Sequence, residues 1–68
     1  MTYEQAAIAG PLLNSYAHSY LGLPYNSVLT TGAMKDDQWF LIVARAGHGA
    51  ETVDSFDEAK RLIDELIQ

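Results

Sequence analysis

The two histidines are the side chains best suited to acid–base or metal chemistry near neutral pH. His18 and His48 lie far apart in a 68-residue chain that contains no cysteine. Their spacing does not form a helical metal pair, and a structural zinc site needs about four ligands. His48 stands between Gly47 and Gly49, where we expect an exposed turn. The sequence therefore predicts neither a metal nor another cofactor.

The acidic residues have structural explanations that need no catalysis. Asp36 and Asp37 have the composition of a hairpin turn, and Asp57 and Glu58 stand where carboxylates favour the positive end of a helix. The sequence has no cysteine nucleophile and no glycine-rich phosphate loop before a helix. We therefore expect no catalytic residue, and we do not expect an enzyme.

The first element that must position these residues is a helix over residues 3–21. Thr2 and Gln5 form a capping-box pattern, and apolar residues then recur at helical spacing. Gly10-Pro11 falls inside this segment, so we expect a kink or a break there. Gly22 predicts the end of the helix near Leu21.

Three strands and a second helix follow. Residues 28–34 and 39–46 are rich in β-branched and apolar residues on either side of a polar turn, and a short third strand is expected over residues 50–53. Ser55 and Glu58 suggest a second capping box before an amphipathic helix that runs to the C-terminus. Residues 1–68 are thus predicted to form a single α+β domain of order α-β-β-β-α, with a three-stranded antiparallel sheet packed against two helices.

The middle strand is apolar on both faces. A sheet with one solvated face alternates apolar with polar residues along each strand. Here the residues of both faces are apolar, with Trp39, Leu41 and Val43 on one face and Phe40, Ile42 and Ala44 on the other. Two short helices can cover one face of such a sheet. Either the helices divide between the two faces, or another chain covers one of them, or the central strand of a small domain is simply apolar on both sides.

Charge is distributed unevenly along the chain, which carries −5 overall. No charged residue occurs from Gln5 to Met34, and residues 47–68 carry −4. A surface that lacks charged residues and is rich in tyrosine is typical of contact surfaces, although tyrosines can also fill a domain's own core. We expect the first helix and the loop after it to bind a partner or a second copy, in a dimer for example, through Tyr16, His18, Tyr20 and Tyr25. Charged substitutions at Tyr16 and His18 should then weaken association while the domain stays folded.

The acidic C-terminal third is a second candidate surface. An array that includes Glu51, Asp54, Asp57 and Glu58 can compete for a basic nucleic-acid channel by charge mimicry. The alternative is an acidic face that only confers solubility. The acidic balance itself opposes direct binding to a phosphate backbone.

The element order resembles the layout of double-stranded-RNA-binding domains. The likeness covers nearly the whole chain and includes Gly47-His48-Gly49 followed by Ser55-Phe56-Asp57-Glu58-Ala59-Lys60. That family places lysines at the start of its second helix to contact phosphates, where this sequence has Asp57 and Glu58. The layout is also similar to small toxin ribonucleases of the HicA type, which act through a histidine near the sheet. These resemblances imply a nucleic-acid-related domain or a His48-dependent ribonuclease as alternatives.

Small size, acidity and a neutral surface bearing tyrosines are similar to small phage-encoded inhibitors such as anti-CRISPR proteins. This resemblance implies a non-enzymatic inhibitor that blocks a host protein or nucleoprotein complex. No apolar stretch reaches the ~18 residues of a membrane span, and no basic region of a signal peptide is visible. We therefore expect a cytoplasmic protein-binding module.

Overall fold

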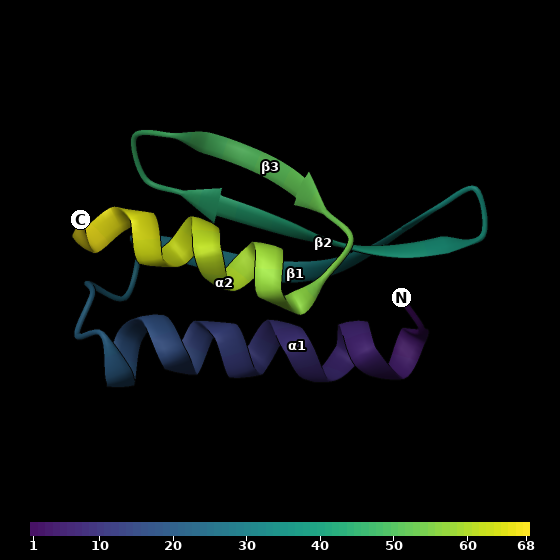
Figure 1. The fold of residues 1–68 in the computed structure, drawn as a ribbon, viewed down its shortest axis with the longest axis horizontal. Helices are drawn as coiled ribbons and strands as arrows, with labels where there is room; N and C mark the ends of the chain where they lie inside the picture. Colours follow the sequence, from purple (N-terminus) through teal and green to yellow (C-terminus); the bar gives the residue numbers. More distant parts are fainter.

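The computed structural model describes all 68 residues. Its helices and strands follow one another in the order that hydrophobic periodicity and the helix-capping patterns predict. The structure confirms an α+β fold in which a helix, a three-stranded antiparallel sheet and a second helix follow one another (Figure 1). The elements are α1 (Tyr3–Ser15), a π-helical turn (Tyr16–Tyr20), β1 (Val28–Lys35), β2 (Gln38–Arg45), β3 (Gly49–Val53), α2 (Phe56–Asp64) and a final 3-10 turn (Glu65–Ile67).

The first helix starts and ends where the sequence indicates, but it is not broken at Gly10-Pro11. Both hydrogen bonds of the Thr2–Gln5 capping box are present, and Gly22 follows the helix with a φ of 70°. Pro11 lies inside a continuous α1. A proline there removes the bond to the carbonyl of Ala7. Because Ala7 and Pro11 are both exposed, that carbonyl can bind water instead. The departure from α geometry comes later, in the π-helical turn.

Gly10 is required by the close approach of α1 to β1. A Cβ atom at Gly10 would lie 3.1 Å from the carbonyl oxygen of Thr30, and one at Gly32 would lie 3.3 Å from the Cβ of Ala6. A glycine in each element thus allows helix and strand to pack closely. A break at Gly10 would remove this contact.

Asn14 closes the outer edge of β1. Its Nδ2 donates to the carbonyl oxygen of Thr30 at 3.2 Å, and the Thr30 N–H donates to its Oδ1 at 2.8 Å. Since β1 is an edge strand in the sheet order β1-β2-β3, these bonds satisfy backbone groups that no strand pairs with. The side chain therefore fixes α1 against the sheet.

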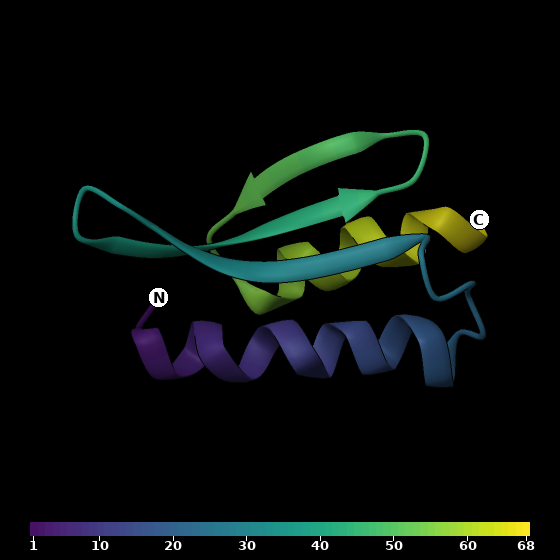
Figure 2. The same cartoon turned by 180° about the vertical axis from the view of Figure 1, so that it is seen from behind.

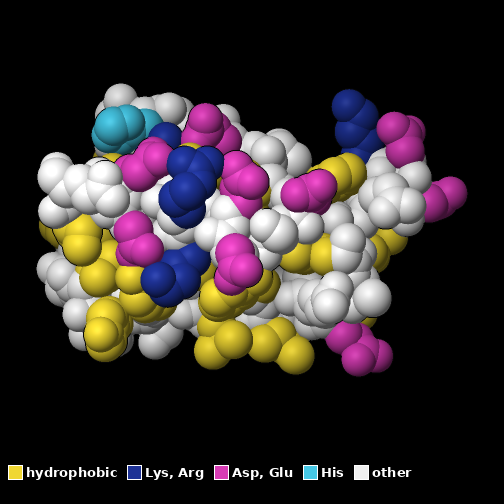
Figure 3. Space-filling model, viewed as in Figure 1, with side chains coloured by type: hydrophobic (Ala, Val, Ile, Leu, Met, Phe, Trp, Pro, Cys, Tyr) yellow, Lys and Arg dark blue, Asp and Glu magenta, His cyan; other side chains and the backbone are white.

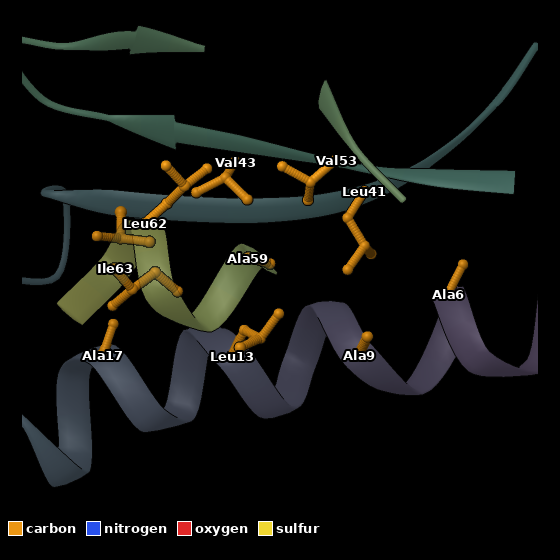
Figure 4. Close-up of a cluster of buried hydrophobic side chains, with 11 residues drawn as sticks. Ala6, Ala9, Leu13, Ala17, Leu41, Val43, Val53, Ala59, Leu62 and Ile63 are labelled. Atoms are coloured by element: carbon orange, nitrogen blue, oxygen red, sulfur yellow. The ribbon is translucent and has the colours of Figure 1, made fainter. Parts of the chain in front are cut away.

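Both helices pack on the same face of the sheet, as the two opposite views show (Figures 1 and 2). The buried apolar side chains come from α1, from α2 and from the inward positions of the strands (Figure 4). Leu13, Leu41, Val43 and Ile63 are fully buried at the centre. Of the alternatives for covering both faces, division of the helices between them is therefore wrong, and the opposite face of the sheet is uncovered by this chain.

Candidate binding surfaces

The face of the sheet opposite the helices is not covered by any element of this chain, whereas a closed domain covers both faces of its sheet. Strand register places its side chains in three rows across the sheet, of which the central row is Thr31, Ile42 and Thr52. One flanking row holds Leu29, Ala44 and Ala50, and the other holds Ala33 and Phe40. We call these eight residues the open sheet face. None of them is charged, and Lys35 stands only at the rim.

The relief of the open sheet face is uneven. Leu29 projects with 62% of its surface exposed. A depression of about 530 Å³ extends from the central row toward the β1–β2 hairpin, and its lining residues are Ala33, Met34, Lys35, Phe40, Ile42 and Thr52. A protruding side chain and a hollow thus lie on either side of Thr31–Ile42–Thr52.

A second apolar surface lies on the helix side of the molecule. A groove of about 480 Å³ runs between α1 and the start of α2, and Ile8, Leu12 and Phe56 contribute its larger exposed side chains together with Met1. We call this the helix groove. Hydrophobic side chains also gather over α1 in the space-filling view (Figure 3). The molecule therefore presents apolar surface on two opposite sides of one core.

Of the four aromatic residues proposed for partner binding, Tyr16 is engaged inside the molecule. Its hydroxyl donates to the carboxylate of Asp64 in α2, and Lys60 Nζ lies 4.8 Å from its ring centre. Lys60 also donates to Asp64 at 3.1 Å. These contacts join α1 to α2, so an acidic substitution of Tyr16 would disturb the fold as well as any interface. That substitution does not test association alone.

This cluster shifts the protonation of its members. The hydrogen bond from Tyr16 lowers the pKa of the Asp64 carboxyl, and the same bond raises the pKa of the tyrosine. The hydrogen bond to Asp64, followed by that to Tyr16, raises the pKa of Lys60. Each shift favours the arrangement seen, in which a neutral phenol and an ammonium both face a carboxylate.

The remaining aromatic residues lie at the C-terminal end of α1 and in the loop that follows. Tyr20 is 79% exposed and stacks on Tyr16 with ring centres 5.4 Å apart. Tyr25 is 87% exposed and stacks on the half-buried ring of His18 at 5.0 Å. His18 and Tyr25 therefore lie beside the edge of β1, whereas Tyr20 lies against Tyr16, whose hydroxyl faces α2.

The four acidic site candidates lie between β3 and the first turn of α2, and two of them are already paired. Glu51 accepts from Arg45 at 3.0 Å, and Glu58 accepts from Arg61 at 2.8 Å. Basic and acidic side chains alternate over this region in the space-filling view (Figure 3). Asp54 and Asp57 form no salt bridge in the structure. Pairing within the chain thus reduces the field that this array presents to a basic partner.

Arg45 organises this region, and the sequence reading assigned it no role. Its side chain is buried on the helix side of the sheet, where it donates to the carbonyl oxygen of Leu62 at 3.0 Å and to Glu65 at 3.2 Å. With Glu51, these bonds connect β2, β3 and the C-terminal end of α2. Its place among the inward-facing residues Leu41 and Val43 was the only signal in the sequence.

His48 lies exposed in the turn between β2 and β3, where no hydrogen bond or ion pair reaches its ring. No group of three or more His, Asp or Glu side chains is placed to hold a metal ion. None of the helices has the length and hydrophobicity that crossing a membrane requires.

Comparisons with protein-family models, with curated proteins and with solved structures give no significant match for this chain.

Proposed function

We propose that this protein is a small non-enzymatic binding module that acts through contacts with other protein chains. The observation that carries this proposal is the open sheet face, because it leaves Leu29 exposed and Phe40 and Ile42 only half-buried on a side that no element of this chain covers. The absence of charge across these eight residues is the composition of an interface core. The module would act by blocking or bridging protein surfaces.

The helix groove supports the same proposal from the opposite side. Ile8 and Leu12 are 59% and 53% exposed on a helix whose other side is fully buried. An apolar groove between two helices is a form of surface into which a partner's side chains can insert. Two contact surfaces on opposite sides suit a protein that bridges. They also suit an inhibitor of the anti-CRISPR type that occupies a host surface.

Charge mimicry has less support, because Glu51 and Glu58 are paired within the chain. The nucleic-acid alternative has less support for a related reason. Asp57 and Glu58 occupy the start of α2, and three of the four positive side chains, Arg45, Lys60 and Arg61, are engaged in salt bridges. A ribonuclease centred on His48 would need a second catalytic group, and none contacts its ring.

A capture experiment with surface variants tests the proposal. Wild-type protein, Ile42→Glu and Leu12→Glu would be immobilised at equal density, exposed to host lysate, and the retained proteins quantified by mass spectrometry. Ser15→Glu is the control, because Ser15 is exposed on α1 and lies outside both apolar surfaces. We expect at least one apolar variant to reduce a retained protein by ~10-fold or more, as loss of an interface hot spot does. Ser15→Glu should retain that protein.

Three results would contradict the proposal. One is that wild type and both apolar variants retain the same proteins in the same amounts. The second is retention of the chain on an RNA or DNA column at ~0.15 M salt, which favours a nucleic-acid-related domain. The third is RNA cleavage that is lost in His48→Ala.

A further inference from the structure

We infer that a second copy of this chain covers the open sheet face, in a two-fold dimer whose axis crosses the strands at the row Thr31–Ile42–Thr52. This inference rests on the proposed function, since it names the occupant of one of its two surfaces. It follows from three features of that face: its charge, its relief and its symmetry. The helix groove would remain free on the outer side of each protomer.

The charge of the face favours a second copy over a basic partner. The chain carries −5, so a cationic partner would be steered toward acidic side chains. Asp57 at the start of α2 and Asp36 and Asp37 at the hairpin tip lie away from the face, whereas Asp54 borders it beside Phe40 and Thr52. Two neutral faces can therefore meet with Asp54 at their rim.

The rows of the open sheet face complement one another when the face is turned on itself. A two-fold axis along the central row, perpendicular to the strands, places that row over the same row of the second copy. The row that contains Leu29 and Ala44 then lies over the row of Ala33 and Phe40 of the second copy. In register terms, Leu29 then faces Ala33 of the second copy, and Phe40 faces Ala44. Large side chains oppose small ones at both positions, which is how packed layers interdigitate.

The relief of the face agrees with this arrangement. The exposed side chain of Leu29 would enter the depression beside Ala33 and Phe40 of the second copy, and the same contact would occur twice by symmetry. Two sheets stacked in this way lie about 10 Å apart. The arrangement gives Leu29, which is 62% exposed in the protomer, a packing partner.

Edge-to-edge pairing is a less favourable route to a dimer. Asn14 already occupies the backbone groups of Thr30 on the outer edge of β1. Those groups of Thr30 point away from β2, so the backbone N–H and C=O of its partner Val43 point toward Glu51 in β3. The backbone groups of Ala50 and Thr52 then point outward, on the free edge of β3. Pairing two β3 strands about Glu51 would bring two like charges to facing positions. The open sheet face has no such penalty.

The size of the face sets the strength of the dimer. The three strands lie about 4.8 Å apart, and β1 and β2 have eight residues while β3 has five, so at ~3.4 Å per residue the sheet spans at most roughly 27 by 14 Å. Stable interfaces usually bury about 800 Å² of accessible surface per partner. The contact therefore lies at the small end of the range, and we expect a dimer that forms at micromolar concentrations.

Sedimentation equilibrium between ~5 µM and ~1 mM, together with circular dichroism, tests the inference. Wild type should shift from monomer to dimer, and Ile42→Glu should raise the dissociation constant by ~10-fold or more with folding retained. Ile8→Glu, the same change in the helix groove, should dimerise like wild type. A wild type that stays monomeric throughout would overturn the inference, as would a dimer unaffected by Ile42→Glu.

A size exchange tests the pairing of Phe40 with Ala44 in a way that does not depend on Ile42→Glu. Ala44→Phe alone should weaken the dimer by ~10-fold, because two phenyl rings would then face each other where one fits. Adding Phe40→Ala should restore the dissociation constant to within about 3-fold of wild type. If the double variant is no tighter than Ala44→Phe, the two-fold arrangement is wrong. The proposed function can survive that result, since loss of captured proteins in Leu12→Glu or Ile42→Glu is measured separately.

Discussion

At the scale of single residues, Arg45 stabilises the fold from a position where a cation is unexpected. Its guanidinium bonds Glu51, Glu65 and the carbonyl of Leu62 while only 9% of the residue is exposed. The two carboxylates are 49% and 39% exposed, so water can solvate them if the arginine is removed. The Leu62 carbonyl would lose its partner in a buried site.

Arg45→Met keeps much of the apolar stem and removes the charge. We expect it to lower the free energy of unfolding by about 2–4 kcal/mol, which is the range for losing hydrogen bonds to a buried charge. Urea unfolding followed by circular dichroism measures this. Arg61→Met is the matched control, because Arg61 forms comparable ion pairs at 58% exposure, where solvent screens them. Equal losses in both variants would show that burial of Arg45 does not matter.

The roles of Asn14 and Arg45 could not be predicted from the sequence. Asn14 bonds a residue 16 positions away and Arg45 one that is 17 positions away, so no local spacing reveals either pair. In contrast, the Thr2–Gln5 and Ser55–Glu58 patterns act within one helical turn. The first is a complete capping box, and in the second Ser55 accepts from the Glu58 N–H while the Glu58 carboxylate binds Arg61. Local devices were predictable because their partners are neighbours in the chain.

At the scale of elements, the strands and helices were predictable and their placement was not. Alternation in β2 showed that both faces are apolar, yet only the register shows that Leu41 and Val43 face the helices while Ile42 does not. The end of the helical segment that α1 and the π-helical turn form, just before Gly22, followed from its sequence. Its continuity through Pro11 did not, because that depends on the exposure of the unpaired carbonyl.

The β1–β2 turn is tighter than the sequence indicated and carries strain. The strands extend to Lys35 and Gln38, so Asp36 and Asp37 alone connect them with φ values of 53° and 63°. Both lie in the left-handed region, which costs a residue with a Cβ atom ~1–2 kcal/mol and which two-residue hairpins usually fill with Asn-Gly.

Asp37→Gly should therefore stabilise the protein. We expect a gain of about 0.5–1 kcal/mol, since relief of the left-handed conformation exceeds the entropy that glycine adds to the unfolded chain. Thermal unfolding should show a rise of roughly 2–8 °C for a domain of this size. Gly47→Ala is the reciprocal control, because Gly47 has a φ of 81° and open space around it. It should destabilise the protein, and a destabilised Asp37→Gly would contradict this account of the turn.

At the scale of the whole molecule, the Tyr16–Asp64–Lys60 cluster links α1 to α2 and makes their contact depend on pH. The pKa of Asp64 is lower in the folded chain, so its contribution is complete above its unfolded value near 4 and is lost as pH falls through the folded value. The pKa values of Tyr16 and Lys60 are raised, so their contributions are complete below about pH 10 and are lost as pH rises through the folded values.

Tyr16→Phe isolates this cluster from the other titrating groups. The variant removes the hydroxyl that Asp64 accepts from and keeps the ring beneath Lys60. We therefore expect its free energy of unfolding to fall less than that of wild type both below pH 4 and above pH 10. Chemical unfolding from pH 2 to pH 11 measures the two profiles. Tyr20→Phe should follow the wild-type profile, because the Tyr20 hydroxyl forms no hydrogen bond in the structure. If Tyr16→Phe and Tyr20→Phe have the same pH profile, the hydroxyl of Tyr16 does not couple the helices. The stability of the contact between them would then depend on apolar packing alone.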